Sequence, residues 1–185
     1  MSGLVTQNSL LLNKLLEFYN KDGNMEKILP IINGESLISL RLIDWFATNY
    51  SKKYYTVYPL KTRLGEEKRF KVYIDYKLKL KAYSKRRFDP FCRWERITIP
   101  YKNDTYIQTT IGQLNFFRWT LENKILSYIE KNLIQINNDM QKRNSTAKNR
   151  KEKQTTKTRK KREELSISAS KSIKKEKVEI VVDFK

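Results

Sequence analysis

The sequence predicts an α+β fold: N-terminal helices, a small and mostly antiparallel sheet and a long C-terminal helix, followed by a disordered basic tail. Three observations predict it. Apolar residues recur at helical spacing near both ends of the first 141 residues. Between these ends, apolar and polar residues alternate as they do in strands. From residue 142 to residue 177 the chain is rich in lysine and arginine and contains no aromatic residue.

Helices are expected at the N-terminal end. Ser9 to Asn20 places its leucines and Tyr19 on one face at helical spacing. Residues 28–32 form a short apolar run, which Pro30 is expected to break. Ser39 has the side chain of a helix N-cap, so a further helix is predicted through residue 49 or 50.

The middle of the chain is expected to form strands. Residues 54–58 are β-branched and aromatic, and 64–67 have the composition of a turn. Residues 70–81 alternate strictly between apolar and polar side chains, which is the strongest strand signal in the sequence. Helical spacing of Tyr76 and the apolar residues after it leaves an alternative, in which the strand ends near Tyr76 and a helix follows. Further strands are predicted at 94–101 and 106–109.

A long helix is predicted to end the domain. Thr110 and Gln113 form a capping-box pattern at its start. Apolar residues then recur every three or four positions as far as Ile136, so the helix is expected to run from about residue 111 to about 140.

The distribution of charge sets the expected domain boundaries. The whole chain has a net charge of +19, and residues 142–177 hold 15 Lys and Arg against 4 Asp and Glu, a net charge of +11. Such a segment buries too little apolar surface to offset the entropy of ordering it. We therefore expect a globular domain over 1–141, a disordered basic tail over 142–177 and a short strand-like peptide over 178–185. This last peptide is expected to pair with an exposed sheet edge, in this chain or in a partner.

Composition excludes several classes of site. The chain has no histidine and a single cysteine, Cys92, so it builds neither a Cys/His zinc site nor a histidine-dependent catalytic triad. No Gly-rich phosphate loop is present. We expect no cofactor, no metal and no enzymatic activity. No apolar run is long enough to span a membrane and no signal peptide is recognised, so an intracellular location is expected.

A polyanion is the partner that this charge favours, and nucleic acid, either DNA or RNA, is the commonest one. Two basic clusters lie in the tail, where they would act as a binding arm or as an import signal. A third lies around the Asp89-Pro90 turn, where arginines and lysines are mixed with aromatic residues that are themselves expected to be core anchors. The predicted nucleic-acid-binding residues are Lys85, Arg86, Arg87, Arg93, Arg96, Lys148, Arg150, Lys151, Lys157, Arg159, Lys160, Lys161 and Arg162. Lys71, Lys77, Lys79 and Lys81 would extend the third cluster into one positive face.

A metal-dependent nuclease is a further alternative. Asp75-Tyr76-Lys77 matches the Asp-x-Lys element that such enzymes carry on a strand. The second carboxylate would have to come from Asp44, Asp89 or Glu95.

Three blocks, Ser39–Lys53, Leu80–Arg96 and Thr110–Asn123, resemble small and mostly uncharacterised proteins of nucleocytoplasmic large DNA viruses. The resemblance covers about residues 36–135, and Phe88–Arg93 (Phe-Asp-Pro-Phe-Cys-Arg) is its most specific part. It supplies no catalytic residues. It implies a role in viral genome organisation or transcription, in the viral factory or nucleus, with viral transcription or virion proteins as further partners. The competing expectation is a virion structural protein that binds an acidic protein partner.

Overall fold

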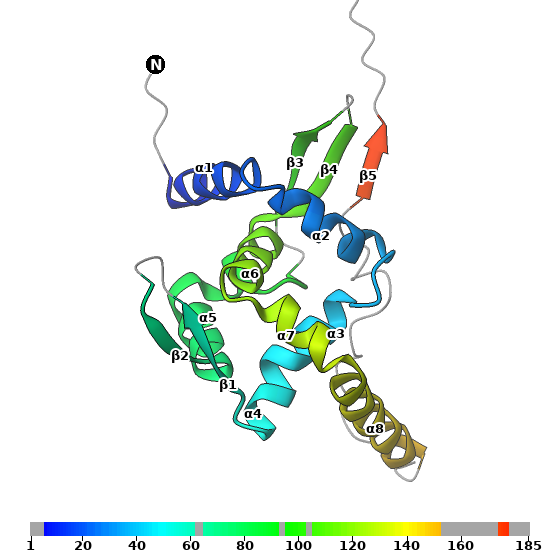
Figure 1. Cartoon of the computed structure of the whole chain (residues 1–185). Helices are drawn as coiled ribbons and strands as arrows, with labels where there is room; N and C mark the ends of the chain where they lie inside the picture. The colour runs from blue at the N-terminus through cyan, green and yellow to red at the C-terminus, as the bar shows by residue number, and fades with distance from the viewer. Residues whose placement is uncertain (1–5, 62–64, 93–94, 103–104, 153–173, 178–185) are drawn as a thin grey trace, which may run out of the picture.

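Helices surround a small core, and two small sheets lie at its edges (Figure 1). The computed structural model describes residues 6–61, 65–92, 95–102, 105–152 and 174–177. The elements are α1 (Gln7–Tyr19), α2 (Asn24–Asn33), α3 (Leu40–Trp45), the π-helical turn η1 (Phe46–Tyr50), α4 (Ser51–Lys53), β1 (Val57–Lys61), β2 (Glu67–Lys71), α5 (Val72–Phe88), β3 (Arg96–Tyr101), β4 (Thr105–Thr110), α6 (Ile111–Glu122), α7 (Ile125–Lys131), α8 (Leu133–Glu152) and β5 (Lys174–Lys177). The predicted α+β class is confirmed.

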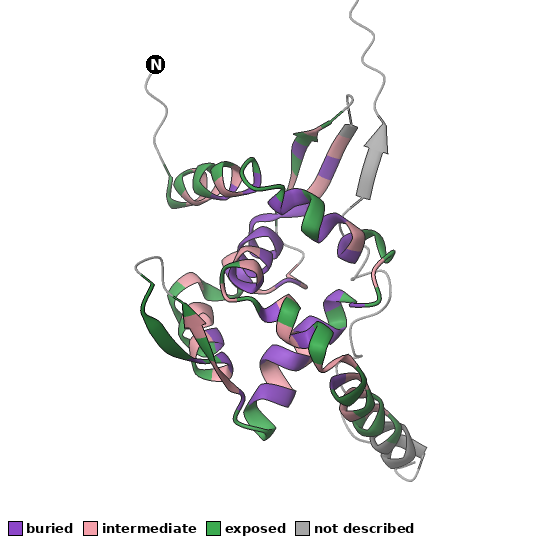
Figure 2. Cartoon of the chain, in the orientation of Figure 1, coloured by how far each residue is buried: buried purple, intermediate pink, exposed green. Residues whose placement is uncertain are grey.

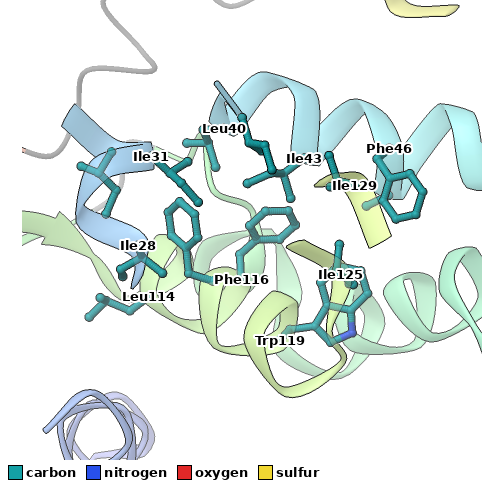
Figure 3. Close-up of a cluster of buried hydrophobic side chains, with 14 of the residues drawn as sticks. Ile28, Ile31, Leu40, Ile43, Phe46, Leu114, Phe116, Trp119, Ile125 and Ile129 are labelled. Carbon is teal, nitrogen blue, oxygen red and sulfur yellow. The ribbon is translucent and has the colours of Figure 1, made fainter. Parts of the chain in front are cut away.

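Helix α6 forms the centre of the core. From Ile111 to Thr120 every residue is buried except the half-buried Arg118, so α6 is covered on nearly all sides (Figure 2). Phe116 and Trp119 pack with apolar side chains from α2, α3 and α7 (Figure 3). Phe88 at the end of α5 is fully buried against them, as predicted for a core anchor.

Serine and threonine caps start the helices where the sequence predicts them. The Ser39 hydroxyl accepts a hydrogen bond from the Leu42 amide at the start of α3, and η1 extends this helical segment to Tyr50. The Thr110 hydroxyl accepts one from the Gln113 amide at the start of α6. The expected break at Pro30 is wrong: this proline lies inside α2, which continues to Asn33 and ends at Gly34 in the left-handed conformation.

The strand predicted over residues 70–81 is also wrong. Strand β2 ends at Lys71, where it completes the antiparallel hairpin with β1, and α5 begins at Val72. Val72 and Tyr76 are buried one helical turn apart, and Leu80 packs partly on the core. The helix following a strand was the alternative, although it begins four residues earlier than Tyr76. Tertiary burial of one face of α5 decides between two patterns that the same residues satisfy.

The helix predicted over about 111–140 is divided into α6, α7 and α8. Asn123 and Asn132 stand at the two breaks, and the amide of each donates to the carbonyl four residues earlier, on Trp119 and Tyr128. Lys124 adopts a left-handed conformation with φ of 52° at the first break. The Trp119 and Tyr128 carbonyls also accept the backbone N–H of the same asparagine, so each asparagine binds the end of its helix through both its backbone and its side chain.

Contacts of Asp139 fix α8 on the domain. Its carboxylate accepts hydrogen bonds from the Trp45 indole and the Tyr54 hydroxyl, both at 3.2 Å, and forms an ion pair with Lys53. The Arg143 guanidinium lies 5.5 Å from the centre of the Trp45 ring. Burial raises the pKa of Asp139, but the hydrogen bonds from Lys53 and Trp45 outweigh it and hold that pKa below its usual value.

The structure differs from the predicted tail at both ends. Helix α8 continues through Glu152, although residues 142–152 were expected to be disordered. Lys174–Lys177 forms β5, which pairs antiparallel with β4 in the sheet order β3-β4-β5. A sheet edge therefore receives a C-terminal strand, but that strand lies just before the predicted peptide 178–185, which is outside the described residues. Residues 153–173 are also outside them.

No helix in the described part of the chain is long and apolar enough to cross a membrane.

Candidate nucleic-acid interface

The structure separates the predicted binding residues. Lys85, Arg86 and Arg87 lie in the last turn of α5, and Arg96 begins β3. The backbone of Lys148, Arg150 and Lys151 lies in α8. Arg93 and the second tail cluster, Lys157, Arg159, Lys160, Lys161 and Arg162, are outside the described residues.

Arg87 is held by the fold. Its guanidinium donates to the side-chain oxygens of Asn8 at 2.7 Å and Gln7 at 3.0 Å, and so joins α1 to the end of α5. Arg86 and Arg87 line a small hollow that also contains the acidic residue Glu95. A carboxylate there reduces the attraction of this hollow for phosphate, so the basic character of the α5 terminus is greatest on the side of Lys85.

A larger hollow lies along the outer face of α5. It has a volume of about 600 Å³. Its lining residues are Tyr73, Ile74, Lys77, Leu78, Leu80, Lys81 and Lys85. Ile74 and Leu78 are 42% and 60% exposed, so this face of α5 presents apolar side chains between its lysines.

A second, smaller hollow joins the first at Tyr73 and Ile74. Its other lining residues come from α4, the connection after it, β1 and β2: Ser51, Lys52, Tyr55, Thr56, Val57 and Lys71. The Lys52 ammonium lies 5.7 Å from the centre of the Tyr73 ring. We call the two hollows together the α5 groove.

Lysines are the charged residues that line the α5 groove, and no acidic side chain is among the described residues there. They are Lys52, Lys71, Lys77, Lys81 and Lys85, and all five are exposed. None of the five forms an ion pair within the part of the chain that the structure describes. The groove is therefore a surface of uncompensated positive charge.

Helix geometry keeps the acidic residue of α5 away from the groove. Asp75 lies in the first turn, where a carboxylate also interacts favourably with the helix dipole. Its side chain accepts a hydrogen bond of 2.8 Å from the Trp119 indole on α6. Asp75 thus joins α5 to the core, while Lys77 and Lys81 point along the opposite face.

The position of Asp75-Tyr76-Lys77 in the structure differs from the one expected for a nuclease element. The three residues lie on a helix and not on the strand that this nuclease element requires. Within the described ranges, no group of three or more Asp, Glu or Cys residues is placed to hold a metal ion.

Ser84 places Lys85 beside the groove. Its φ of 65° and ψ of 166° interrupt α5, and this conformation is rarely adopted by residues other than glycine. The helix axis changes direction there, so that Phe88 enters the core while Lys85 still lines the groove.

Asp44 and Asp89 are both half-buried, and the charge of Asp89 acts on Asp44. Burial raises the pKa of Asp44 to about 7, and the negative charge of Asp89 adds to this shift. Asp89 accepts a hydrogen bond from the Phe91 amide in the turn after α5. Burial also raises the pKa of Tyr76, which feels both carboxylates. Cys92, expected to be buried, is half-buried in this turn.

Sequence reasoning found part of the α5 groove. It grouped Lys71, Lys77, Lys79 and Lys81 with the basic residues around Lys85. The structure places Lys71, Lys77, Lys81 and Lys85 along the groove, whereas Lys79 is not among the residues that line it. It missed Lys52 and Tyr55, which come from another element. Lysines followed by two tyrosines are a weak sequence signal for a binding site. Lys52 and Tyr55 reach the groove only because α4 packs against α5.

Comparison with known proteins identifies the family. A family model described as "Family of unknown function (DUF7197)" matches residues 4–185. The chain belongs to this family. The chain is also similar to "Uncharacterized protein L507" of Acanthamoeba polyphaga mimivirus, with 43% identity over 152 residues. This supports the predicted resemblance to proteins of large DNA viruses, while the Phe88–Arg93 motif stays a prediction.

The alignment covers 79% of this chain and 58% of the mimivirus protein. The chain thus spans less than two thirds of that relative's length. No solved structure matches.

Proposed function

We propose that this member of the family is a non-enzymatic nucleic-acid-binding protein, which acts through phosphate contacts in the genome organisation or transcription of a large DNA virus. One observation carries the proposal: five exposed lysines line the α5 groove, and none of the described lining residues is acidic. A viral factory, the nucleus or the virion would each bring such a protein to nucleic acid.

Electrostatics supports this partner over an uncharged one. Each lysine that neutralises a phosphate releases condensed counterions, which favours binding at low salt. None of the five groove lysines has to break an ion pair with a described residue before it binds a phosphate, and the contact of Lys52 with the Tyr73 ring is a weak one on an exposed surface. Binding therefore costs little reorganisation of the fold.

The basic tail adds to this attraction. Residues 142–177 carry a net charge of +11, and the described parts of this segment start on α8 and return to the sheet at β5. Charge in the tail raises affinity for any polyanion, whereas the groove gives the contacts a fixed place on the domain.

The test compares two variants with equal loss of charge. Lys77→Gln/Lys81→Gln/Lys85→Gln removes three groove lysines. The control, Lys14→Gln/Lys21→Gln/Lys131→Gln, removes three exposed lysines on α1, the turn after it and α7. The dependence of log K on log salt is measured with duplex and single-stranded DNA for each full-length protein.

The groove variant is expected to lower the salt slope by about 2 to 3, because each lost phosphate contact removes about 0.7 to 0.9. The control should change the slope by much less. Equal slopes for the two variants would refute the groove as the binding site. If the wild type binds DNA no more tightly than it binds an acidic protein, the virion-protein alternative is favoured instead.

A further inference from the structure

The α5 groove has a feature that phosphate contacts do not require. Its floor is apolar and aromatic, with Tyr55 65% exposed, Leu78 60% exposed and Ile74 42% exposed. Exposed apolar side chains cost free energy in water, and a contiguous group of them marks a contact surface. Duplex DNA presents phosphates and groove edges to a protein, so it would leave this floor in water.

We propose that the α5 groove binds a single-stranded polynucleotide, with bases against its floor and phosphates on its lysines. This inference rests on the proposed nucleic-acid binding and specifies the class of ligand. Single strands expose the faces of their bases, which stack on aromatic and apolar side chains without regard to sequence. The groove supplies both parts of that arrangement.

The aromatic rings lie where two hollows meet. Tyr73 lines both hollows, and Tyr55 lines the smaller one next to Lys52 and Lys71. A base on either ring would have lysines within reach of its flanking phosphates. Lys77 and Lys81 lie one helical turn apart, with a rise of about 6 Å between them, so both follow one strand along the helix.

The smaller hollow also contains an unsatisfied polar group. Thr56 is 6% exposed, and its hydroxyl makes no hydrogen bond within the described structure. Buried polar groups are nearly always paired, so an unpaired one at this place is notable. The hollow has a volume of only about 30 Å³, so a water molecule, and not a base, is the partner that fits beside this hydroxyl.

Other occupants fit less well. A bilayer would meet the lysines, but a flat surface cannot enter two connected hollows. An acidic amphipathic helix would match the charge and the apolar floor, but it has no flat faces for Tyr55 and Tyr73 to stack on. Charge, aromatic rings and concave shape together favour the single strand.

The experiment uses the full-length protein and fluorescence anisotropy with a labelled oligothymidylate and with a duplex of equal length. Tyr55→Leu and Tyr73→Leu remove a ring, whereas Tyr55→Phe and Tyr73→Phe keep it. Near-ultraviolet circular dichroism verifies that each variant is folded. Vesicles that contain phosphatidylserine and an acidic helical peptide serve as competitors.

The wild type is expected to bind the single strand about tenfold tighter than the duplex, and each leucine variant to lose about tenfold for the single strand only. The phenylalanine variants should retain wild-type affinity. Equal affinity for both ligands, or equal losses on both in the leucine variants, would overturn the inference while leaving nucleic-acid binding intact. Displacement of the strand by vesicles or peptide at lower concentration than by unlabelled strand would also overturn it. If the lysine variants leave all binding unchanged, the groove is not the binding site; if the wild type binds neither the single strand nor the duplex, the proposed function itself fails.

Discussion

Replacing Asp44 by asparagine should stabilise the protein at alkaline pH and leave it unchanged at acid pH. Asp44 lies on α3 with a small exposed fraction, and its carboxylate makes no hydrogen bond or ion pair with the described residues. Burial raises its pKa to about 7, and the charge of Asp89 contributes to that shift. Asparagine has the shape of the protonated acid and carries no charge at any pH.

The sign follows from proton binding. In the unfolded chain Asp44 titrates near 3.8, whereas in the folded protein it titrates near 7. Between these values the folded state holds the extra proton, so the free energy of unfolding falls as pH rises through this window and then levels off. The difference between these two pKa values corresponds to roughly 4 kcal/mol in the free energy of unfolding. Because Asp44 keeps some contact with solvent, we expect about 2 to 4 kcal/mol.

Urea unfolding at about pH 4 and about pH 8 measures the effect. Asp44→Asn should match the wild type at the acid pH and exceed it by about 2 to 4 kcal/mol at the alkaline pH. Asp22→Asn, in an exposed turn, is the control and should change neither value. An equal effect of Asp44→Asn at both pH values, or a loss of stability at the alkaline pH, would show that the carboxylate is paired in solution.

Three further substitutions test the packing and the backbone geometry of the domain. Gly112→Ala places a methyl group 2.9 Å from the Asp89 carbonyl oxygen, and should lower thermal stability by about 1 to 3 kcal/mol; an unchanged melting temperature would contradict this close approach of α6 to the end of α5. Ser84→Gly relieves a strain of about 1 to 3 kcal/mol at a cost of about 0.5 to 1 kcal/mol in chain entropy, so a net gain of about 1 kcal/mol is expected in urea unfolding; destabilisation would show that the kink is unstrained. Tyr19→Phe removes a buried hydrogen bond of 2.6 Å to the Leu114 carbonyl, and calorimetry should detect a loss of about 1 kcal/mol; no loss would mean that the bond contributes nothing.

The helix caps and a core anchor were predicted correctly from the sequence, because each depends on a local pattern that has a single physical explanation. Ser39 and Thr110 cap their helices because a short hydroxyl side chain satisfies an amide that the helix leaves unpaired. Phe88 is a core anchor because a large apolar ring before a tight turn has no other favourable place. These elements depend on neighbours in the sequence, so the sequence alone suffices to place them.

In residues 70–81, one pattern of apolar residues fits both a strand and a helix. Residues 70–81 alternate as a strand does, yet Val72 and Tyr76 also share a helical face. The alternation depended on Ile74 and Leu78, which a buried strand would cover and which α5 leaves exposed in the groove. The wrong strand prediction and the proposed site thus involve the same two residues, which are apolar but exposed on α5.

The candidate site was only partly predictable because it is assembled from distant segments. Lys77, Lys81 and Lys85 lie close together in the sequence, and a common positive face was predicted for them together with Lys71 and Lys79, although from a strand pattern and not from the helix that carries them. Lys52 and Tyr55 reach the same groove only because α4 and the β1–β2 hairpin pack beside α5. No periodicity in the chain encodes that approach.

The central claim is that nucleic acid lies in the α5 groove, and covalent labelling of lysines in the unmodified protein tests it most directly. Acetylation with and without a saturating oligothymidylate is followed residue by residue by mass spectrometry. We predict protection of the groove lysines: Lys52, Lys71, Lys77, Lys81 and Lys85. Exposed lysines elsewhere on the domain, such as Lys14 and Lys131, should react equally in both samples. Protection confined to the tail, or shared equally by all exposed lysines, would contradict the account.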